Sequence, residues 1–223
     1  MKKLDSRSPI GVEDKLYGND KIVHILTFYE CVNFKRKLKV TKSREEILAQ
    51  YNKGLVMVFT GNGKGKTTAA LGQALRAIGH GNRVYLLQFM KGRKYGELLA
   101  AEKYLPDLTF HLAGLDSFVM RGGPAPIDIE LAKQGLDIAR EVIKSNEYDM
   151  VILDEITVAI DFKLIPLNKV IQIIKNKPAK LHLILTGRYA PPEIINLADT
   201  VSEIKEIRHH YTAGIKERTG IDY

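Results

Sequence analysis

The residues best suited to chemistry form a glycine-rich stretch in the second quarter of the chain. It reads Gly61, Asn62, Gly63, Lys64, Gly65, Lys66, Thr67 and Thr68. Glycines let the backbone turn its N–H groups toward one point, and a helix that follows directs its positive end to the same point. A lysine adds a charge for phosphates, and the hydroxyl after it is a ligand for Mg²⁺. The stretch therefore predicts a nucleoside triphosphate site.

The spacing of this loop differs from the common phosphate-binding pattern by one residue. That pattern is a glycine, four residues, and then Gly-Lys-Ser/Thr. Counted back from Gly65, the first glycine would fall at position 60, which is Thr60, and the nearest glycine is Gly61. The loop is therefore either a loose ATPase motif or a loop shaped for different chemistry on a nucleotide.

A pair of carboxylates is the second candidate. Asp154 and Glu155 follow the apolar run "MVIL". A carboxylate at the end of a buried strand acts on Mg²⁺ or on its bound waters in phosphoryl-transfer enzymes. Beside the glycine-rich loop, a functional interpretation is favoured over an ordinary strand end. The sequence leaves open which of the two carboxylates acts on the metal.

Basic side chains supply further candidates for phosphate contact. Arg188 follows the run "LHLILTG", where a guanidinium can bind a phosphate through two hydrogen bonds. Arg76 is placed two turns into the helix after the loop, where it either flanks the triphosphate or lies on the solvated face. Gln88 and Lys91 follow another apolar run in the same way.

The elements that must position these residues alternate along the chain from residue 55. A continuous apolar run typical of a strand buried on both faces is expected at 55–60. Further strands are expected at 84–89, 108–113, 150–155 and 181–187, with a last strand near 200–207. Helices are expected from the loop to residue 78, at 95–105, 127–145 and 166–176, and after Pro192. The first helix should bury the face that carries Leu71, Ala74, Leu75 and Ile78.

This alternation predicts an α/β fold. A mostly parallel β-sheet flanked by helices, with the glycine-rich loop after its first strand, is the P-loop NTPase (RecA-like) arrangement. Ligands bind such sheets beyond the carboxyl ends of the strands, and every candidate residue above falls at such an end.

Composition narrows the class of protein. The 223 residues are 45% hydrophobic and 27% charged, which is typical of a soluble globular protein. No run reaches about 18 apolar residues, so no membrane partner is expected, and the start lacks the apolar region of a secretory signal. The single cysteine, Cys31, cannot form an internal disulfide. These features predict a cytoplasmic protein.

The positive charge gathers at one end of the sequence. Residues 1–54 hold 12 Lys or Arg and 7 Asp or Glu, so five of the eight net positive charges lie there. The densest piece, residues 35–44, lacks aromatic residues that stack on bases. No nucleic-acid partner is expected. His80, His209 and His210 have no companions at metal-ligand spacing, which favours solvated or capping roles.

Five segments together resemble the P-loop type of ATP:corrinoid adenosyltransferase, or cob(I)alamin adenosyltransferase. They are "FTGNGKGKTTAALGQALRAIGHG", "QFMKG", "VILDEI", "LTGR" and the closing "LADTVSEIKEIRHHYTAGIKERTGIDY". The likeness runs from about Val56 to Tyr223. The one-residue-short loop and the "AGI…GIDY" ending are its most specific parts.

The resemblance implies a definite reaction. Such enzymes transfer the 5′-deoxyadenosyl group of ATP to the Co(I) centre of a corrinoid and release inorganic triphosphate, in adenosylcobalamin biosynthesis or corrinoid salvage. Cobalt is the nucleophile, so the protein holds the triphosphate, positions C5′ and stabilises the leaving group. By this likeness Gly61–Thr68 wraps the triphosphate and Lys66 neutralises it. Thr67 supports Mg²⁺ with Glu155 or Asp154, and Arg76 and Arg188 assist nucleotide binding.

The resemblance also implies an organisation. Members are generally homodimers in which N-terminal residues help to cover the active site. Here residues 1–54 are an N-terminal extension, and residues 55–223 are the adenosyltransferase domain. Ser43 and Glu46 form a capping-box pattern that predicts a helix at 43–53, the candidate lid. A flavoprotein-type reductant that delivers Co(I) is a candidate partner.

One departure from the family concerns aromatic residues. Members often carry a Trp after the "KG" of "QFMKG" and a Phe within a "GF.W" stretch, which help to displace the lower axial ligand of the corrinoid. This chain has no tryptophan and reads "KGRKYGE" and "AGLDSFVMRGG" at these places. Tyr95 and Phe118 are the candidate substitutes.

Without the resemblance the patterns leave three classes of enzyme open. They are the adenosyltransferase, a RecA-like P-loop NTPase that acts on nucleic acid, and a small-molecule kinase. The resemblance favours the adenosyltransferase and suggests why the loop is one residue shorter than the common pattern. A kinase loop presents the γ-phosphorus to an acceptor, whereas this loop must hold the whole triphosphate as a leaving group and turn C5′ toward cobalt.

Overall fold

The structure is a computed structural model that describes residues 53–116, 119 and 121–222. The chain divides into two units, residues 1–51 and 52–223, and only the second contains described residues. Cys31 and, apart from Lys53, the candidate lid at 43–53 lie outside them. The lid and the domain boundary at residue 54 therefore stay predictions.

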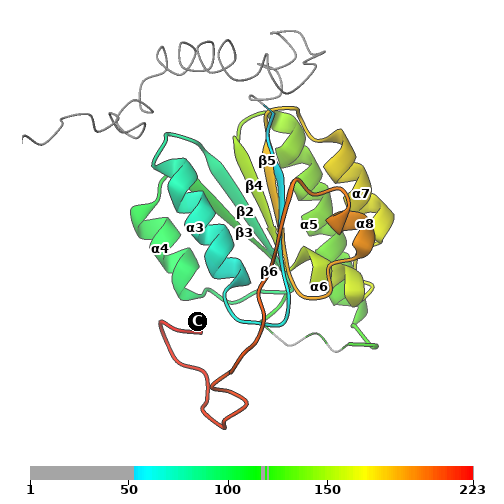
Figure 1. Cartoon of the computed structure of the whole chain (residues 1–223). Coiled ribbons are helices and arrows are strands. Elements are labelled where there is room, and N and C mark those ends of the chain that lie inside the picture. Colours follow the sequence, from blue (N-terminus) through cyan, green and yellow to red (C-terminus); the bar gives the residue numbers. More distant parts are fainter. Residues whose placement is uncertain (1–52, 117–118, 120, 223) are drawn as a thin grey trace, which may run out of the picture. The chain divides into compact units, whose positions relative to one another are not determined.

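A six-stranded parallel sheet forms the centre of the described part. Its strands are β1 (Val56–Thr60), β2 (Val84–Phe89), β3 (Leu108–Ala113), β4 (Met150–Asp154), β5 (His182–Thr186) and β6 (Thr200–Glu203), in the spatial order β3-β2-β4-β5-β1-β6. All five pairings are parallel (Figure 1). Because every strand ends at the same edge, the loop after β1 and the carboxylates after β4 meet there, with only β5 between them.

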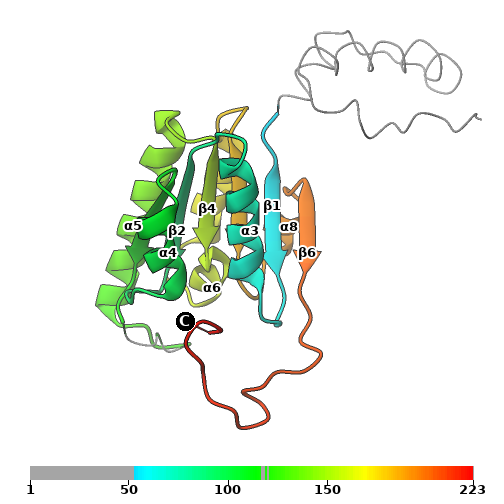
Figure 2. The same cartoon turned by 90° about the vertical axis from the view of Figure 1, so that its left-hand side faces the viewer.

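Helices cover both faces of the sheet. Those on one face are α3 (Lys66–Ile78) and α4 (Gly96–Tyr104); those on the other are α5 (Pro126–Ser145), α6 (Ile156–Asp161), α7 (Leu167–Asn176) and α8 (Pro192–Ile195), as Figures 1 and 2 show. The prediction of an α/β fold with a parallel sheet flanked by helices is confirmed. Among the described residues, no helix is long and apolar enough to cross a membrane.

Two apolar clusters pack these layers together. Alternate residues of each strand point to opposite faces, as the period of a strand requires. On β4, Val151 and Leu153 join the cluster under α5–α8, while Met150 and Ile152 join the cluster under α3 and α4. This two-sided burial explains the unbroken apolar runs in the sequence.

The buried face of α3 differs from the expected one. Ala70, Ala74 and Ala77 are buried, whereas Leu75 is 57% exposed. Small side chains let the helix that follows the loop approach the sheet closely, so an alanine stripe faces the core, with Leu71 and Ile78 partly buried against it. The prediction of the helix was right, and that of its apolar face was right for Leu71, Ala74 and Ile78 and wrong for Leu75.

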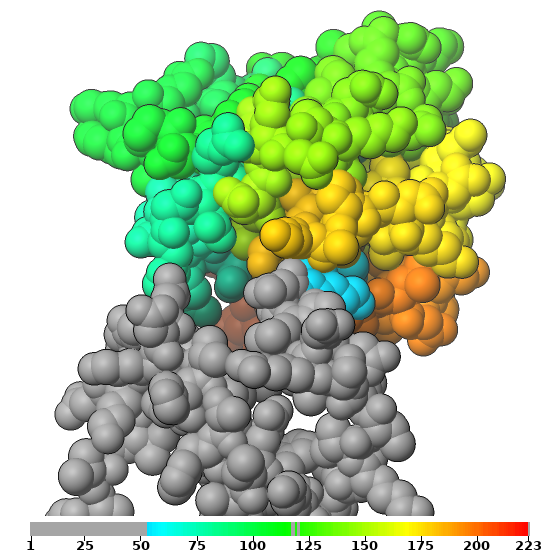
Figure 3. Space-filling view, turned by 90° about the horizontal axis from the view of Figure 1, so that it is seen from above, coloured from blue at the N-terminus to red at the C-terminus, as the bar shows by residue number. Residues whose placement is uncertain are grey.

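Two further differences lie beside the edge where the strands end. α6 was not predicted; it begins at Ile156, directly after Glu155, which is the N-cap of the helix. β6 ends at Glu203 rather than near residue 207, because the chain leaves the sheet there. In the space-filling view from the opposite end, where the strands begin, the green residues around α4 and the yellow residues of α7 lie at opposite sides of the described part (Figure 3).

Candidate active site

The phosphate loop, residues 61–65, joins β1 to α3 and turns sharply at two glycines. Gly61 and Gly65 have positive φ of 99° and 116°, in a region that other residues rarely adopt. Gly65 is the N-cap of α3, whose first turn has no acidic residue. The unpaired amides and the positive end of the helix dipole in that turn are therefore available to an anion.

The chain that leaves β6 crosses directly over the front of the phosphate loop. The amide of Gly63 donates to the carbonyl of Ile204 at 2.8 Å, and the amide of Ile204 donates to the carbonyl of Thr60 at 2.8 Å. A Cβ on Gly61 would lie only 2.4 Å from the carbonyl oxygen of Ile204. A glycine is therefore required at position 61 both by the crossing chain and by the positive φ of the turn.

This crossing gives a physical account of the unusual spacing. The Gly63 amide is already paired, so the amides free for phosphate come from the rear of the loop and the start of α3. Position 60 is the last residue of β1; Thr60 is buried, and its Oγ1 accepts a 3.4 Å hydrogen bond from the amide of Ala190. The residue at position 60 thus belongs to the sheet and is tied to the chain after β5.

Lys66 spans the inside of the loop. Its Nζ donates to the carbonyl of Gly63 at 2.7 Å, and only 7% of the residue is exposed. Burial lowers the pKa of Lys66, the carboxylates of Glu155 and Asp154 oppose that effect, and Arg188 adds to it. The ammonium group is therefore held within a cluster of charges at the base of the loop.

Asp154 is fully buried and collects donors from two strands, a helix and the segment after β2. Its Oδ1 accepts from Thr186 Oγ1 at 2.5 Å and from Thr67 Oγ1 at 2.9 Å. Its Oδ2 accepts from Gln88 Nε2 at 3.0 Å and lies 3.5 Å from Lys91 Nζ. Both carboxylate oxygens thus accept hydrogen bonds, and the ammonium group of Lys91 offsets their charge. Asp154 in turn fixes the orientation of the Thr67 hydroxyl.

Glu155 lies in front of this network and faces the open site. It has a positive φ of 59°, and its amide donates to Thr186 Oγ1 at 3.0 Å. Burial raises the pKa of Glu155 above its ordinary value, and the neighbouring Asp154 raises it further, while nearby cations, Lys91 first, offset part of the rise. Thr186 therefore joins both carboxylate residues through one hydroxyl.

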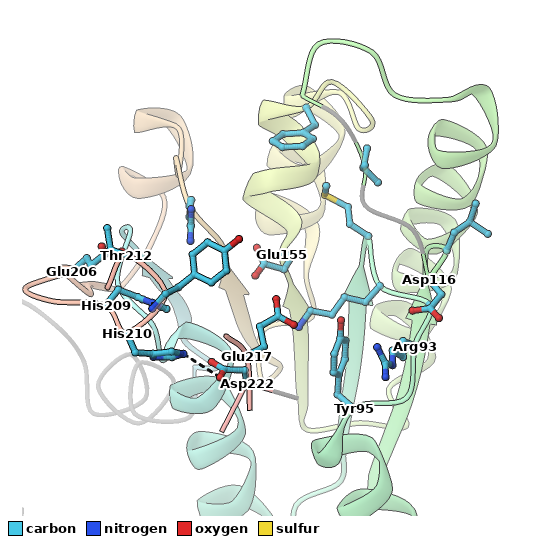
Figure 4. Close-up of a pocket in the computed structure, with 18 residues that line it drawn as sticks. Arg93, Tyr95, Asp116, Glu155, Glu206, His209, His210, Thr212, Glu217 and Asp222 are labelled. Carbon is cyan, nitrogen blue, oxygen red and sulfur yellow. Dashed lines mark hydrogen bonds and ion pairs between the residues drawn. The ribbon is translucent and has the colours of Figure 1, made fainter. Parts of the chain in front are cut away.

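Two adjoining compartments open in front of these residues. One, of about 630 Å³, is lined by the phosphate loop and the start of α3. The other, of about 890 Å³, is lined by the segments after β2 and β3 and by the end of the chain (Figure 4). Both volumes lie within the range of ligand pockets. The residues that line both compartments are Lys91, Glu155, Arg188, His209 and Asp222.

The structure brings most of the predicted phosphate site together. Gly63, Lys64, Gly65, Lys66, Thr67, Thr68, Glu155 and Arg188 all line the smaller compartment. Gly61 and Asn62 belong to the same loop but do not line it, and Asp154 lies buried behind Thr67. Arg76 is exposed and about 15 Å further along the axis of α3 than Lys66. Its predicted role in nucleotide binding has no support from its position in this chain.

The candidate aromatic residues have different outcomes. Tyr95 lines the larger compartment, and its ring centroid lies 5.4 Å from Lys91 Nζ. Phe118 lies outside the described residues. Burial alone would lower the pKa of Lys91, but neighbouring carboxylates, Asp154 first among them, raise it above its ordinary value.

The sequence reasoning missed two groups of site residues. Thr186 was read only as part of the segment before Arg188. The end of the chain, named here the C-terminal strap (residues 204–222), supplies His209, His210, Tyr211, Thr212 and Glu217 to the larger compartment. The "AGI…GIDY" ending could have indicated that the strap belongs to the site. It is among the parts of the sequence most specific to the family, and it lies beyond the last strand of the sheet.

Comparison with known proteins gives concordant results. Residues 52–223 match the model of the family described as ATP:corrinoid adenosyltransferase BtuR/CobO/CobP. A corrinoid adenosyltransferase of Escherichia coli K12 is 38% identical over 176 residues, which is 78% of this chain and 88% of that protein. Corrinoid adenosyltransferase CobA of Salmonella typhimurium LT2 has the same identity over the same shares.

More distant relatives extend the comparison. A corrinoid adenosyltransferase of Pseudomonas aeruginosa PAO1 is 32% identical over 186 residues, which is 83% of this chain and 88% of that protein. Among solved structures, a KaiC-like protein of Pyrococcus horikoshii OT3 has 16% identity and a TM-score of 0.45 over 69% of this chain and 73% of its own, which is a weak likeness.

Proposed function

The chain belongs to the BtuR/CobO/CobP family of ATP:corrinoid adenosyltransferases, and from this premise we propose how its site performs the reaction. The enzyme transfers the 5′-deoxyadenosyl group of ATP to the Co(I) centre of a corrinoid. A nucleic-acid-directed NTPase is not favoured, since the relatives that match are adenosyltransferases.

One observation supports the assignment of roles most directly. The compartment lined by the phosphate loop adjoins a larger one, and the two share Lys91, Glu155 and Arg188 as walls. The triphosphate is assigned to the smaller compartment, and the adenosyl group points from it into the larger one. The corrinoid approaches through the larger compartment, so that cobalt and C5′ meet at the shared wall.

The reaction requires no nucleophile from the protein. The electron pair of Co(I) forms the Co–C5′ bond, and the C5′–O bond breaks with its electrons moving to the α-phosphate oxygen. Inorganic triphosphate leaves, and no proton has to be transferred. The protein therefore contributes charge stabilisation of the leaving group and alignment of the two reactants.

Cations around the smaller compartment suit this leaving group. Lys64 comes from the loop, Lys66 is the first residue of α3, and Arg188 comes from the segment after β5. The first turn of α3 adds backbone amides and the helix dipole. Because the Gly63 amide is paired with Ile204, the phosphates are held from the rear of the loop, which leaves C5′ at the outer side.

The donor set also fits Mg²⁺. Thr67 and Glu155 line the same compartment and offer the oxygen ligands that this ion prefers. Asp154 has both oxygens engaged and orients the Thr67 hydroxyl from behind. Bound there with phosphate oxygens, Mg²⁺ would supply positive charge to the leaving triphosphate. This assignment makes Glu155 rather than Asp154 the carboxylate that faces the metal.

The larger compartment is assigned to the corrinoid. Tyr95 is the aromatic residue among the segments after β2 that line it, and the Lys91 cation lies against its ring. Tyr95 and Phe118 remain the candidates for displacing the lower axial ligand. A cytoplasmic homodimer with the segment 43–53 as lid, served by a flavoprotein-type reductant, completes the proposal. Light scattering during gel filtration tests the dimer.

The identity of the released phosphate compound tests the proposed reaction. Incubation with ATP, Mg²⁺ and reduced cobalamin should yield triphosphate in a one-to-one ratio with alkylated corrinoid, with little orthophosphate. Release of orthophosphate that is stimulated by DNA or RNA and suppressed by salt would support the NTPase instead.

A further inference from the structure

The C-terminal strap begins and ends on neighbouring residues of the phosphate loop. Its first residue, Ile204, accepts a 2.8 Å hydrogen bond from the amide of Gly63. Its last described residue, Asp222, accepts a 2.8 Å hydrogen bond from Nζ of Lys64. The strap is therefore closed on the loop, and its other residues form one wall of both compartments.

Asp222 is a carboxylate surrounded by donors. Oδ1 accepts from Lys64, while Oδ2 accepts the amide of Arg218 at 2.9 Å and lies 3.2 Å from Nε2 of His210 (Figure 4). The hydrogen bond from Lys64, with those from its other neighbours, lowers the pKa of Asp222 to about 2. The group is therefore an anion throughout the neutral range.

This anion lies where a triphosphate is expected. Asp222 lines the smaller compartment together with Gly63, Lys64, Gly65, Lys66 and Thr67. There it pairs with one of the cations assigned to the leaving group. A polyanion in the same compartment would be repelled by the carboxylate and would compete with it for Lys64. Asp222 and a bound triphosphate are therefore alternative partners of the Lys64 ammonium.

We propose that Asp222 is a positioning residue that holds Lys64 when no nucleotide is bound, and that the triphosphate displaces Asp222 from Lys64. The proposal rests on the assignment of the smaller compartment to the triphosphate. When Lys64 changes partner, the end of the strap loses its tie to the loop. Occupancy of the phosphate site is thereby transmitted to the wall of the larger compartment.

Binding of inorganic triphosphate to Asp222→Asn tests the competition. Removing the competing charge should tighten binding by about two- to fivefold at low salt, the range expected for an exposed ion pair. Glu203→Gln is the matched control, since it also removes one carboxylate, whose 3.7 Å ion pair is with Lys205 and not with Lys64. Isothermal titration calorimetry measures the affinity of the wild type and of both variants for triphosphate. If Asp222 had only a structural role, its replacement would weaken triphosphate binding. The direction of the change in affinity therefore distinguishes a structural role from the proposed competition.

Limited trypsin digestion tests the release of the strap. Lys216 and Arg218 lie within the strap and offer cleavage sites. Saturating triphosphate should speed cleavage at these sites in the wild type by about twofold or more, because cleavage follows the open population. Asp222→Asn should already be cleaved at the faster rate and respond no further. Glu203→Gln should behave as the wild type.

The outcomes separate this proposal from the proposed function. If triphosphate binds the wild type but slows cleavage or leaves it unchanged, or if Asp222→Asn binds no more tightly, the exchange is overturned while the phosphate site stands. If triphosphate does not bind the wild type, the phosphate site and the exchange both fail.

Discussion

The hydroxyl of Thr67 donates a 2.9 Å hydrogen bond to Oδ1 of Asp154 and so joins the start of α3 to the end of β4. The two residues are far apart in the sequence, and β5 lies between β4 and β1, the strand that leads into the phosphate loop. Asp154 is held in turn by Thr186 on that intervening strand. A buried carboxylate therefore ties the start of α3, directly after the phosphate loop, to the sheet.

Replacement of Thr186 by valine tests this support. Valine keeps the shape but removes the donor to Asp154 and the acceptor for the amide of Glu155. We expect a loss of about 1–3 kcal/mol in the free energy of unfolding and a lower kcat. Thr186→Ser keeps the hydroxyl and should retain most of both. Chemical denaturation and steady-state kinetics measure these effects; equal losses in the two variants would contradict the role of the hydroxyl.

Replacement of Lys66 by alanine tests the main cation of the loop. Without its ammonium group the triphosphate is neither neutralised nor positioned, so we expect turnover to fall by about 100-fold and ATP to bind more weakly. The fold should remain, as circular dichroism can show. Lys175→Ala, an exposed lysine in the last turn of α7, is the control. A normal rate at saturating ATP with unchanged affinity would refute the assignment.

The raised pKa of Glu155 predicts in which direction the stability of the fold changes with pH. Its pKa is raised above 4.5, mainly by burial and then by Asp154, so the fold favours the protonated carboxyl. That stability is present below pH 4.5 and is lost as the pH rises through the higher folded-state pKa. Glu155→Gln copies the protonated form.

We therefore expect Glu155→Gln to unfold at a higher temperature than the wild type at pH 8, with the difference vanishing below pH 4.5, where Glu is protonated in both states. Adenosylation should be strongly reduced in the same variant. Differential scanning calorimetry of the protein without nucleotide gives the comparison. A variant less stable than the wild type at pH 8 would count against the charge environment described here.

The two candidate arginines should behave differently. Arg188 lines both compartments, whereas Arg76 lies near the far end of α3. We expect Arg188→Ala to raise the KM for ATP by about three- to tenfold, with Arg188→Lys intermediate because it keeps the charge but loses the fork. Arg76→Ala should change little. A larger effect at Arg76 would mean that a second chain brings it to a nucleotide.

The sequence predicted the elements of the fold better than their contacts. The strand at 84–89 was predicted to the residue, because it is buried along its whole length and is an almost unbroken apolar run. The strand at 108–113, at the edge of the sheet and only partly buried, was predicted to the residue as well. α6 was missed, since six residues rich in β-branched side chains carry no helical period. On α3, Leu75 was wrongly placed on the buried face and the buried Ala70 and Ala77 were missed, because alanine weighs little in a hydrophobic pattern.

The candidate site was predicted where it follows a motif and missed where it depends on tertiary contact. Lys66, Thr67 and Glu155 come from local patterns, and all three line one compartment. The bridging role of Thr186 and the return of Asp222 to Lys64 join residues 32 and 158 positions apart. No local pattern encodes such pairs, so the structure was needed to find them.

Direct adenosylation of a corrinoid is the most decisive measurement for this account. The protein, ATP and Mg²⁺ are added anaerobically to cobalamin whose reduction to Co(I) has been verified by its absorbance, and the spectrum is followed. We predict conversion to the spectrum of a light-sensitive alkylcobalamin, with an equal amount of triphosphate formed. A Co(I) spectrum that persists unchanged, with ATP intact or hydrolysed to ADP and phosphate, would contradict the central claim.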